Sequence, residues 1–318
     1  MMTNAPTFAL PQLADVLKAA DALQTQVHRT PVLTSQRLNQ RFACELFFKA
    51  EHLQKTGAFK YRGASYAIQQ LADDVRGVTT HSSGNHGAAL AAAAHQRGIA
   101  AHVVMPKNAV KSKIDAVNAY GGTIHFCEPT QQAREAGMAA LVAQGYVAIP
   151  PYDDDFIIAG QGTAALEFIQ HQAELDILVT PVGGGGLYAG SLLAAQQQAG
   201  LTVIGAEPAQ ANDAYRSLQH GQRVSDHQPD TIADGLRSYV GRRNFALIKQ
   251  YSQGIIPVSE TAIVEAMALI WSHLKQVVEP SAATVLAAIA QEPERFRGQR
   301  VGVILSGGNV DLTKLPFV

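Results

Sequence analysis

The sequence predicts an α/β fold in which parallel, twisted sheets are flanked by helices and arranged in two lobes. Short apolar segments alternate with amphipathic helical segments along most of the chain, and regular βα alternation implies parallel strands with right-handed crossovers. Several apolar segments run directly into loops rich in glycine and serine, and ligands of open α/β sheets bind at such strand ends. A chain of 318 residues is also long for one hydrophobic core.

The first half of the chain shows this alternation most clearly. Apolar residues at helical spacing predict a helix over residues 13–28, which ends before Thr30 and Pro31 because the residue preceding a proline disfavours the helical conformation. A strand over 45–51 leads into a further helix. We then expect strands at 77–82, 102–105, 123–127 and 146–149, separated by helices at 88–97, 110–120 and 131–143.

The second half continues with strands at 177–182, 203–207 and 301–305. No low-complexity linker divides the chain, and no period is regular enough to predict a solenoid.

Cys44 and Cys127 are too few for a disulfide framework, so we interpret both as small hydrophobic residues.

Composition excludes several classes of protein. Hydrophobic residues make up 47% of the chain and charged residues 16%, as in globular enzymes and unlike disordered chains. The net charge of −1 and the lack of a basic stripe argue against a nucleic-acid partner. No apolar stretch is long enough for a membrane span, and the first residues lack a secretory signal pattern. We therefore expect a cytoplasmic protein with neither nucleic acid nor membrane as a partner.

The segment HLQKTGAFKYRGA, residues 52–64, contains an unusual lysine, Lys60, between Phe59 and Tyr61. An ammonium with an ordinary pKa of about 10.4 is a poor nucleophile at neutral pH. Partial desolvation among aromatic rings disfavours the charged form and frees the nitrogen lone pair, which predicts an imine-forming lysine. The alternative is a surface lysine whose stem lies on Phe59 while its ammonium stays in water.

Three loops supply groups that an imine-bound phosphate cofactor needs. HSSGNHGAA (81–89) and VILSGGN (303–309) each place serine and glycine after an apolar strand, and free backbone donors at the start of a helix bind anions such as a substrate carboxylate. TPVGGGGLYAG (180–190) carries four consecutive glycines, whose backbone N–H groups can surround a phosphate. We expect these loops and the lysine segment to converge on one cleft.

Together these segments resemble the pyridoxal-phosphate enzymes of fold type II, the tryptophan synthase beta-like fold, in the branch of serine/threonine dehydratases and serine racemases. The blocks QKTGAFKYRGA, SSGNHG, IAGQGT (158–163), PVGGGGL, IADGLR (232–237) and SGGNVDL occur in the family's order. The resemblance implies a large domain of residues 1–70 plus 151–318, a small domain of residues 71–150, and a homodimer.

The resemblance also implies site roles. Lys60 would carry pyridoxal 5'-phosphate as an imine and act as the base at the substrate Cα. The phosphate would lie against Gly183, Gly184, Gly185, Gly186 and Leu187, the ring against Phe59, Asn85 and Ser306, and the substrate carboxylate at Ser82, Asn85 and His86. A capping or packing role for His86 is an equal alternative.

Three further groups carry narrower expectations. Ser83 corresponds to the racemase serine that works on the face opposite the lysine, and its alternative role is to cap the following helix. Arg134 is predicted to pair with a second substrate carboxylate and so to admit 3-hydroxyaspartate, unless it is a solvated helix arginine. Glu207, Asp213 and the carbonyl of Ala211 resemble the family's site for a divalent cation, Mg²⁺ or Ca²⁺; the alternative is a strand-end Glu and a helix-capping Asp.

The predicted function is α,β-elimination from L-serine or L-threonine to a 2-oxo acid and ammonia. Serine racemase and threo-3-hydroxyaspartate dehydratase are the alternatives within the family, and a non-catalytic phosphate-ligand binding protein is a remote one. Subgroup signals are mixed, because Glu279, Pro280 and Ser281 resemble the racemase branch while residues 152–155 resemble the catabolic threonine dehydratases.

Overall fold

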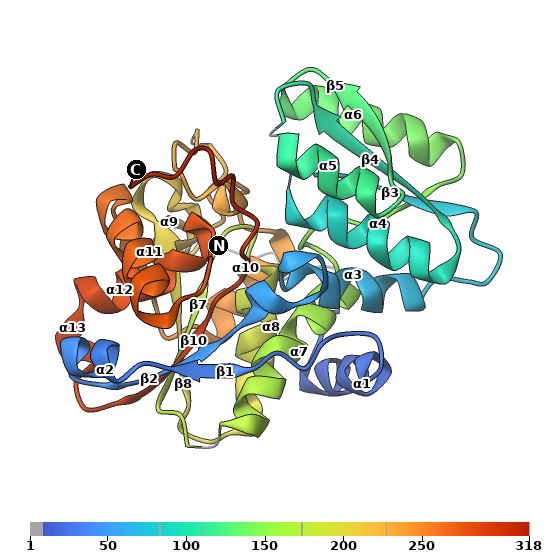
Figure 1. Ribbon diagram of the computed structural model, residues 1–318. Helices are drawn as coiled ribbons and strands as arrows, with labels where there is room; N and C mark the ends of the chain where they lie inside the picture. The colour runs from blue at the N-terminus through green and yellow to red at the C-terminus, as the bar shows by residue number, and fades with distance from the viewer. Residues whose placement is uncertain (1–8, 83, 110, 173, 227, 318) are drawn as a thin grey trace.

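A computed structural model describes residues 9–82, 84–109, 111–172, 174–226 and 228–317 and shows a six-stranded and a four-stranded sheet (Figure 1). The large sheet has the order β1 (Val32–Thr34), β2 (Glu45–Lys49), β10 (Arg300–Ile304), β7 (Ile177–Pro181), β8 (Thr202–Pro208) and β9 (Ile255–Val258). The small sheet has the order β5 (Thr123–Cys127), β4 (Ala100–Pro106), β3 (Gly77–His81) and β6 (Val147–Ala148). All strand pairs described are parallel except β1 with β2, so the predicted fold class is confirmed.

Helices flank both sheets. They are α1 (Leu13–Leu23), α2 (Gln36–Phe42), α3 (Lys60–Gln69), α4 (Asn85–Arg97), α5 (Lys111–Ala119), α6 (Gln131–Ala143), α7 (Asp155–His171), α8 (Gly186–Ala194), α9 (Asp213–His220), α10 (Arg242–Tyr251), α11 (Glu260–Leu274), α12 (Pro280–Gln291) and α13 (Pro293–Phe296). Short 3₁₀ turns are η1 (Glu51–Leu53), η2 (Lys55–Gly57), η3 (Ala195–Gln197), η4 (Ala209–Ala211) and η5 (Asp234–Leu236). No helix among the described residues is both long and apolar enough to cross a membrane.

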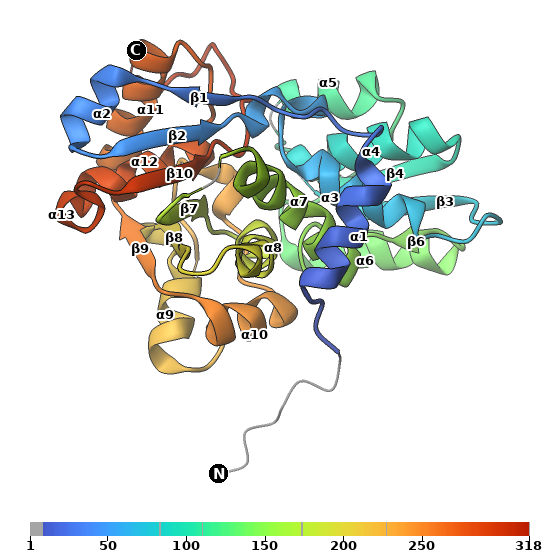
Figure 2. The same ribbon diagram turned by 90° about the horizontal axis from the view of Figure 1, so that it is seen from below.

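The large sheet is covered on both faces, and its central strand β7 is therefore buried along its whole length. All five residues of β7 are buried. Val179 packs in a cluster with residues of α11 and α12, whereas its neighbour Leu178 packs with residues of α7 and α8. Figure 2 shows these two helical layers on opposite sides of the sheet. Successive side chains of a strand point to opposite faces, so a strand buried on both sides has no polar alternation.

Strands from both ends of the chain meet in the large sheet, because β10 lies between β2 and β7. The small sheet is formed entirely by the intervening strands β3 to β6. This topology is compatible with domains of residues 1–70 plus 151–318 and 71–150, but the boundaries stay a prediction.

Helix α7 crosses α3 and α8 closely, and at each crossing two glycines face each other. A Cβ on Gly160 of α7 would lie 2.8 Å from the Cα of Gly63 in α3, and a Cβ on Gly162 would lie 2.8 Å from the carbonyl oxygen of Gly190 in α8. The block IAGQGT therefore brings α7 against both the helix that begins at Lys60 and the helix that follows the four glycines.

The elements differ from the predictions mainly at their ends. α1 ends at Leu23 because the backbone of His28, farther along the predicted helix, exchanges two 2.8 Å hydrogen bonds with the side chain of Gln54. α4 begins at Asn85, directly after Gly84, which lies outside the helix. The short antiparallel strand β1 and helix α2 were not predicted, since three strand residues give little periodic signal.

Candidate active site

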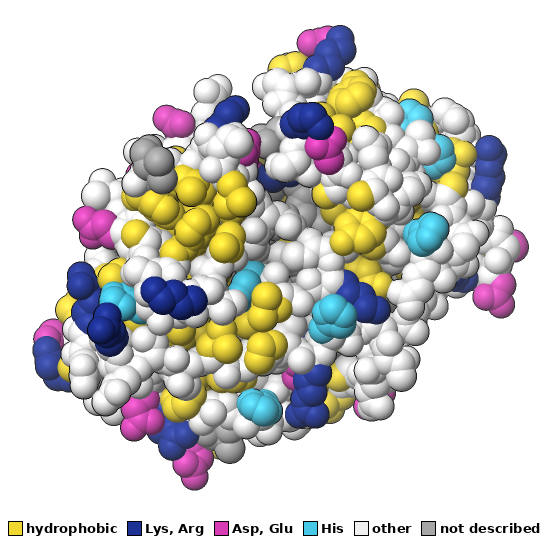
Figure 3. Space-filling view, viewed as in Figure 1, with side chains coloured by type: hydrophobic (Ala, Val, Ile, Leu, Met, Phe, Trp, Pro, Cys, Tyr) yellow, Lys and Arg dark blue, Asp and Glu magenta, His cyan; other side chains and the backbone are white. Residues whose placement is uncertain are grey.

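A cleft of about 740 Å³ lies between the two sheets and collects the predicted site residues. It is lined by residues that follow strands or begin helices, among them Lys60, Ser82, Asn85, His86, Arg134, Gly183, Gly184, Gly185, Gly186, Leu187 and Ser306. In the space-filling view, acidic and basic side chains gather around the hollow between the lobes (Figure 3). Ser83 lies outside the described residues.

Lys60 is the first residue of α3 and half-buried in this cleft. Its Nζ donates a 2.7 Å hydrogen bond to the carbonyl oxygen of Pro151 and lies 5.0 Å from the ring centroid of Phe59. Burial lowers the pKa of Lys60 to about 7. Within the described part of the chain, no carboxylate forms an ion pair with this amine. A substantial fraction of Lys60 is therefore an uncharged nucleophile at neutral pH.

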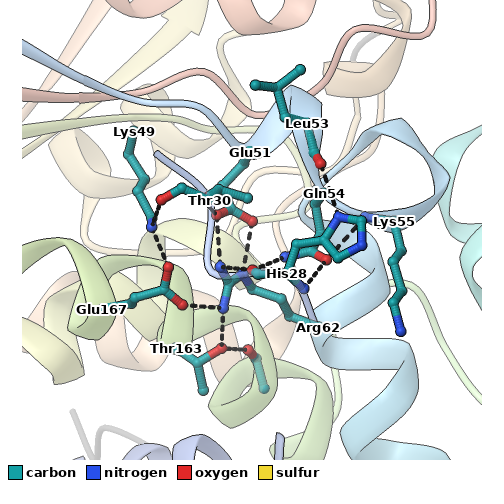
Figure 4. Close-up of polar contacts among 11 residues, drawn as sticks. His28, Thr30, Lys49, Glu51, Leu53, Gln54, Lys55, Arg62, Thr163 and Glu167 are labelled. Carbon is teal, nitrogen blue, oxygen red and sulfur yellow. Dashed lines mark hydrogen bonds and ion pairs between the residues drawn. The ribbon is translucent and has the colours of Figure 1, made fainter. Parts of the chain in front are cut away.

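The start of α3 is anchored by a buried charge network (Figure 4). Arg62 lies two residues after Lys60 and makes two hydrogen bonds to Glu51, of 2.7 and 2.8 Å, and one of 3.1 Å to Glu167. Lys49 completes the network through Glu167 and a 2.7 Å bond to the carbonyl of Thr30. Burial would raise the pKa of Glu51, but the charge and hydrogen bonds of Arg62 hold it below its ordinary value.

The lysine segment is also joined to the loop after β10. The N–H of Phe59 donates to the carbonyl of Ser306 at 3.0 Å, and the N–H of Gly308 donates to the carbonyl of Gly57 at 3.0 Å. Thr56 adopts a left-handed φ of 63°, and its carbonyl accepts a 2.8 Å bond from Asn309. These bonds hold Lys60 and Ser306 on the same wall of the cleft.

At each glycine from Gly183 to Gly186 a side chain would either collide with a neighbour or strain the backbone. A Cβ on Gly183 would lie 2.8 Å from the Cα of Leu236, one on Gly184 would overlap the Tyr152 ring, and one on Gly186 would overlap Gln161 Oε1. Gly185 has a φ of 89°, in the left-handed region. The loop follows β7 and leads into α8, with Leu187 in the first turn, so its backbone donors stand at a helix N-terminus, where anions bind.

Asn85 is fixed from both sides. Its Nδ2 donates to Glu279 at 2.8 Å, and its Oδ1 accepts from Asn309 at 3.0 Å. Glu279 is 3% exposed; burial and the nearby carboxylate of Asp234 raise its pKa to about 7. The second oxygen of Glu279 has no hydrogen-bond partner among the described residues.

His86 lies in the first turn of α4 and is buried. Its Nε2 lies 3.1 Å from the carbonyl oxygen of Ile149, and Nδ1 has no partner in the described chain. Burial, and next the charge of Lys60, lower its pKa to about 3, so the imidazole is neutral. Since that carbonyl can only accept, Nε2 carries the proton and Nδ1 is an acceptor.

Arg134 of α6 and Lys113 of α5 bring basic groups to the small-lobe side of the cleft. Lys113 forms an ion pair with Asp234 of η5, which bridges the lobes. His81 lies at the end of β3, and burial, then the charge of Arg134, lower its pKa.

The predicted cation ligands gather beside α9, away from the cleft lining. Glu207 is fully buried and accepts bonds from the N–H groups of Ala214 (3.0 Å) and Tyr215 (2.8 Å). Burial and Asp213 raise the pKa of Glu207 well above its ordinary value, and burial raises that of Asp213 to about 7. Ala211 is also buried. No cluster of three or more His, Cys, Asp or Glu suited to a metal occurs among the described residues.

Several residues of the site were not predicted as such. Gln161, Asn309 and Asp234 lie within blocks quoted for the resemblance, but nothing in their spacing announced a contact with the site. The Arg62 network gave one usable signal in the sequence, since two charged residues, Lys49 and Glu51, stand together at the end of an apolar strand segment.

Comparison with known proteins agrees with this geometry. β-Hydroxyaspartate dehydratase of Paracoccus denitrificans is 46% identical over 312 residues, covering 97% of this chain and 99% of the relative. Serine racemase of Dictyostelium discoideum is 43% identical over 314 residues, covering 96% and 97%. The crystal structure of a threonine deaminase from T.th. superposes with a TM-score of 0.91 at 39% identity, covering 96% of this chain and all of the other.

The profile of the family described as pyridoxal-phosphate dependent enzyme matches residues 23–307. The match spans the lysine segment, the glycine loop and Ser306, and the relatives above are similar over nearly their full length. The chain therefore belongs to the pyridoxal-phosphate-dependent enzymes of fold type II, in the branch of the serine/threonine dehydratases and serine racemases.

Proposed function

We propose that this protein is a lyase that uses pyridoxal 5'-phosphate to remove water from a small β-hydroxy amino acid, L-serine or L-threonine, releasing a 2-oxo acid and ammonia. The observation that carries this proposal is the state of Lys60. Its amine lies in the cleft on a backbone carbonyl, has no carboxylate partner in the described chain, and has a pKa of about 7. A lysine in that state can act both as a nucleophile and as a base.

The residues around Lys60 fit the cofactor. The four glycines offer backbone donors for a phosphate at the start of α8, and Ser306, Asn85 and Phe59 offer a hydroxyl, an amide and an aromatic ring on the walls of the cleft. When bound, pyridoxal phosphate supplies an electron sink for the negative charge that develops at the substrate Cα.

The chain's own groups would handle the substrate. The start of α4, with Ser82, Asn85 and neutral His86, would receive the carboxylate through hydrogen bonds and the positive end of the helix. The Lys60 amine would take the Cα proton, and the β-hydroxyl would leave as water. The resulting enamine adds water and loses ammonia, so the net products are one 2-oxo acid and one ammonia.

A paired assay tests this proposal. Purified protein loaded with pyridoxal phosphate is given L-serine, L-threonine and L-threo-3-hydroxyaspartate, and oxo acid, ammonia and D-isomer are followed together. We expect a visible cofactor band and oxo acid. In Lys60→Ala both are expected to be lost, with turnover reduced by at least about 10³-fold. A parent protein that binds the cofactor but releases no oxo acid from any of the three would contradict the lyase assignment.

A second substrate, 3-hydroxyaspartate, is favoured by Arg134. This arginine lines the cleft on α6, on the wall that also carries His81. A guanidinium can bind a second carboxylate through two parallel hydrogen bonds. The relative of 46% identity, β-hydroxyaspartate dehydratase, supports this direction. Racemisation stays a prediction that rests on Ser83, and D-serine formation in the paired assay tests it.

Arg134→Ala distinguishes the substrates. A lost charge-assisted bond costs about 1.5–3 kcal/mol, so we expect KM for hydroxyaspartate to rise about 10- to 100-fold. Serine, which has one carboxylate, is the internal control and is expected to change little. An unchanged preference between the two substrates would remove Arg134 from substrate recognition.

We also propose a divalent cation, Mg²⁺ or Ca²⁺, at Glu207, Asp213 and the carbonyl of Ala211. Burial raises the pKa of both carboxyls, and the charge of Asp213 further raises the pKa of Glu207. Two buried carboxylates that are costly to ionise suit a hard cation with oxygen ligands. Because the pKa of Asp213 is raised in the fold to about 7, ionising it above that pH destabilises the cation-free protein.

Added Mg²⁺ is therefore expected to raise the unfolding temperature by a few degrees at pH 8 and by less at pH 6, where Asp213 keeps its proton. Asp213→Asn should abolish the increase. Equal shifts in Asp213→Asn and the parent protein would assign the effect to another site.

The homodimer is the remaining proposal. Exposed apolar side chains support it, including Leu53 (46% exposed), Val277 (46%) and Leu312 (65%). Sedimentation or light scattering at micromolar concentration tests it, and a mass near the 33.9 kDa of one chain would contradict it.

A further inference from the structure

The carbonyl group of Pro151 accepts two hydrogen bonds from side chains of different helices. Lys60 Nζ donates to it at 2.7 Å from α3, and Gln161 Nε2 donates to it at 3.2 Å from α7. A carbonyl oxygen has two lone pairs, so the pair of bonds uses its full capacity. The position of the lysine amine is thus defined by a carbonyl that Gln161 also holds.

The Pro151 carbonyl belongs to a segment, residues 151–153, that is held by several hydrogen bonds. The next carbonyl, of Tyr152, accepts a 3.1 Å bond from Asn244, and that amide also donates to Gly184 in the glycine loop at 2.6 Å. The carboxylate of Asp153 accepts the first N–H groups of α10 at 3.0 and 2.9 Å. Three consecutive residues, 151–153, are therefore anchored to three separate partners, and the Pro151 oxygen cannot easily turn away from the cleft.

Gln161 is itself fixed by the close crossing of three helices. It is fully buried, and a Cβ on Gly63 of α3 would lie 2.9 Å from its Cγ. Its Oε1 has no hydrogen-bond partner in the described chain and lies against Gly186, at the start of α8. One side-chain amide thus contacts the lysine's carbonyl with its nitrogen and the end of the glycine loop with its oxygen.

The immediate surroundings of Lys60 are uncharged. His86 of α4 is neutral, and burial raises the pKa of Tyr152, so that phenol also keeps its proton at neutral pH. Glu279, the residue before α12, lines the cleft but is hydrogen-bonded to Asn85, and Lys113 is paired with Asp234 across the cleft. Arg134 lines the cleft on α6. An ammonium at Lys60 is therefore stabilised chiefly by a neutral dipole, which allows it to lose its proton readily.

We propose that the Pro151 carbonyl, oriented by Gln161, is the resting position of the Lys60 amine whenever that amine is not bonded to the cofactor, and that Gln161 is a positioning residue for Lys60. The proposal rests on the proposed role of Lys60. A lysine displaced by substrate has to remain close to the substrate Cα as a base and then return as a nucleophile. A fixed neutral acceptor holds the amine without locking it in the charged form.

The test measures cofactor capture by the cofactor-free protein. The Lys60 nitrogen bonds to the aldehyde carbon of pyridoxal 5'-phosphate, the aldehyde oxygen leaves as water, and the visible band reports the rate. This rate is followed from pH 6 to pH 10 for the parent protein and for Gln161→Glu and Gln161→Met, with folding checked by circular dichroism.

The two Gln161 variants are expected to change the pH profile in different ways, whereas a general loss of structure would affect both alike. A carboxylate at position 161 should favour the ammonium and move the midpoint of the pH profile upward by about one unit or more, because an opposite charge within about 4–6 Å shifts a pKa by that amount. Gln161→Met, which keeps the volume and removes the amide, should slow capture several-fold at the alkaline plateau with little upward movement of the midpoint. If Gln161→Met fails to fold, the near-isosteric Gln161→Glu alone still gives the shift.

The matched control is Gln198→Glu, since Gln198 also donates its amide to a backbone carbonyl, that of Leu175 at 2.6 Å, but lies outside the cleft lining. Its pH profile should match that of the parent protein. An alkaline plateau rate in folded Gln161→Met equal to that of the parent protein would overturn the proposal. Absence of any band in the parent protein would instead overturn the role of Lys60 itself, so the two failures are distinguishable.

Discussion

Lys49 and Lys60 are both lysines withdrawn from water, at opposite ends of the segment that enters α3, yet their surroundings differ. Lys49 ends β2, is 1% exposed and is paired with Glu167. Burial lowers the pKa of Lys49, but Glu51 and Glu167 oppose that effect. Burial alone lowers the pKa of Lys60, to about 7, because its acceptor is the neutral carbonyl of Pro151. Burial is common to both, and the missing counter-charge is what makes Lys60 reactive.

The comparison also shows that Lys49 belongs to a structural network, whereas Lys60 lies in the cleft. Lys49, Arg62, Glu51 and Glu167 contribute two positive and two negative charges, and each charge is hydrogen-bonded within the network (Figure 4). Such a network is costly to break, because removing one member leaves another charge buried and unpaired. Because Arg62 belongs to the first turn of α3, this network fixes the part of the helix that carries Lys60.

The largest expected effect comes from Arg62→Met, which would leave Glu51 buried without its main partner. We expect a loss of about 3–5 kcal/mol in the free energy of unfolding, the usual result of removing one partner of a buried pair. Urea unfolding of the cofactor-free protein measures it. A loss below about 1 kcal/mol would mean that the network contributes no more than a surface ion pair.

A smaller loss is expected for Lys49→Met. Arg62 would still pair with Glu167, and that glutamate keeps 16% of its side-chain surface in water. The expected cost is therefore about 2–3 kcal/mol, with cofactor capture retained. Disappearance of the cofactor band in a folded Lys49→Met protein would show that Lys49, too, takes part in cofactor binding, and the contrast between the two lysines would fail.

The only stabilising effect is expected for Lys60→Met. The folded-state pKa of about 7 lies below the ordinary 10.5, so the unfolded chain binds more protons between those values and the contribution of Lys60 to stability rises with pH. Near pH 6 the buried ammonium is a cost, so its removal should raise the free energy of unfolding, whereas near pH 10 the amine is already uncharged in the fold and the gain is smaller. Thermal unfolding at both pH values checks the sign.

Much of the fold and of the candidate site could be predicted from the sequence, but the contacts that position the site could not. Strands and helices with clear periodicity were predicted closely, and two elements, β5 and α6, have the predicted bounds. The lysine and the glycine loops were recognisable because few structural roles require such residues in a row. Contacts that depend on tertiary geometry, such as Gln161 with Pro151, join residues whose spacing follows no helical or strand period.

The pairing of charges was likewise invisible before folding. Arg62 and Glu167 are 105 positions apart, and nothing local indicates that they meet. Glu279 was noted only as a subgroup marker, although the fold places it against Asn85. Sequence reasoning identified the groups that can do chemistry, whereas the groups that position them emerged only when the helices were packed together.

The most direct test of the central claim is the pKa of Lys60 itself in the cofactor-free protein. Nuclear magnetic resonance of lysines labelled at Cε, titrated from pH 5 to pH 11 and assigned with Lys49→Met and Lys60→Arg, gives both lysines in one experiment. We expect Lys60 to titrate near pH 7 and Lys49 at a higher pH. A Lys60 that titrates near the ordinary 10.5 would contradict the account, because an unpaired buried amine would then behave as a surface lysine.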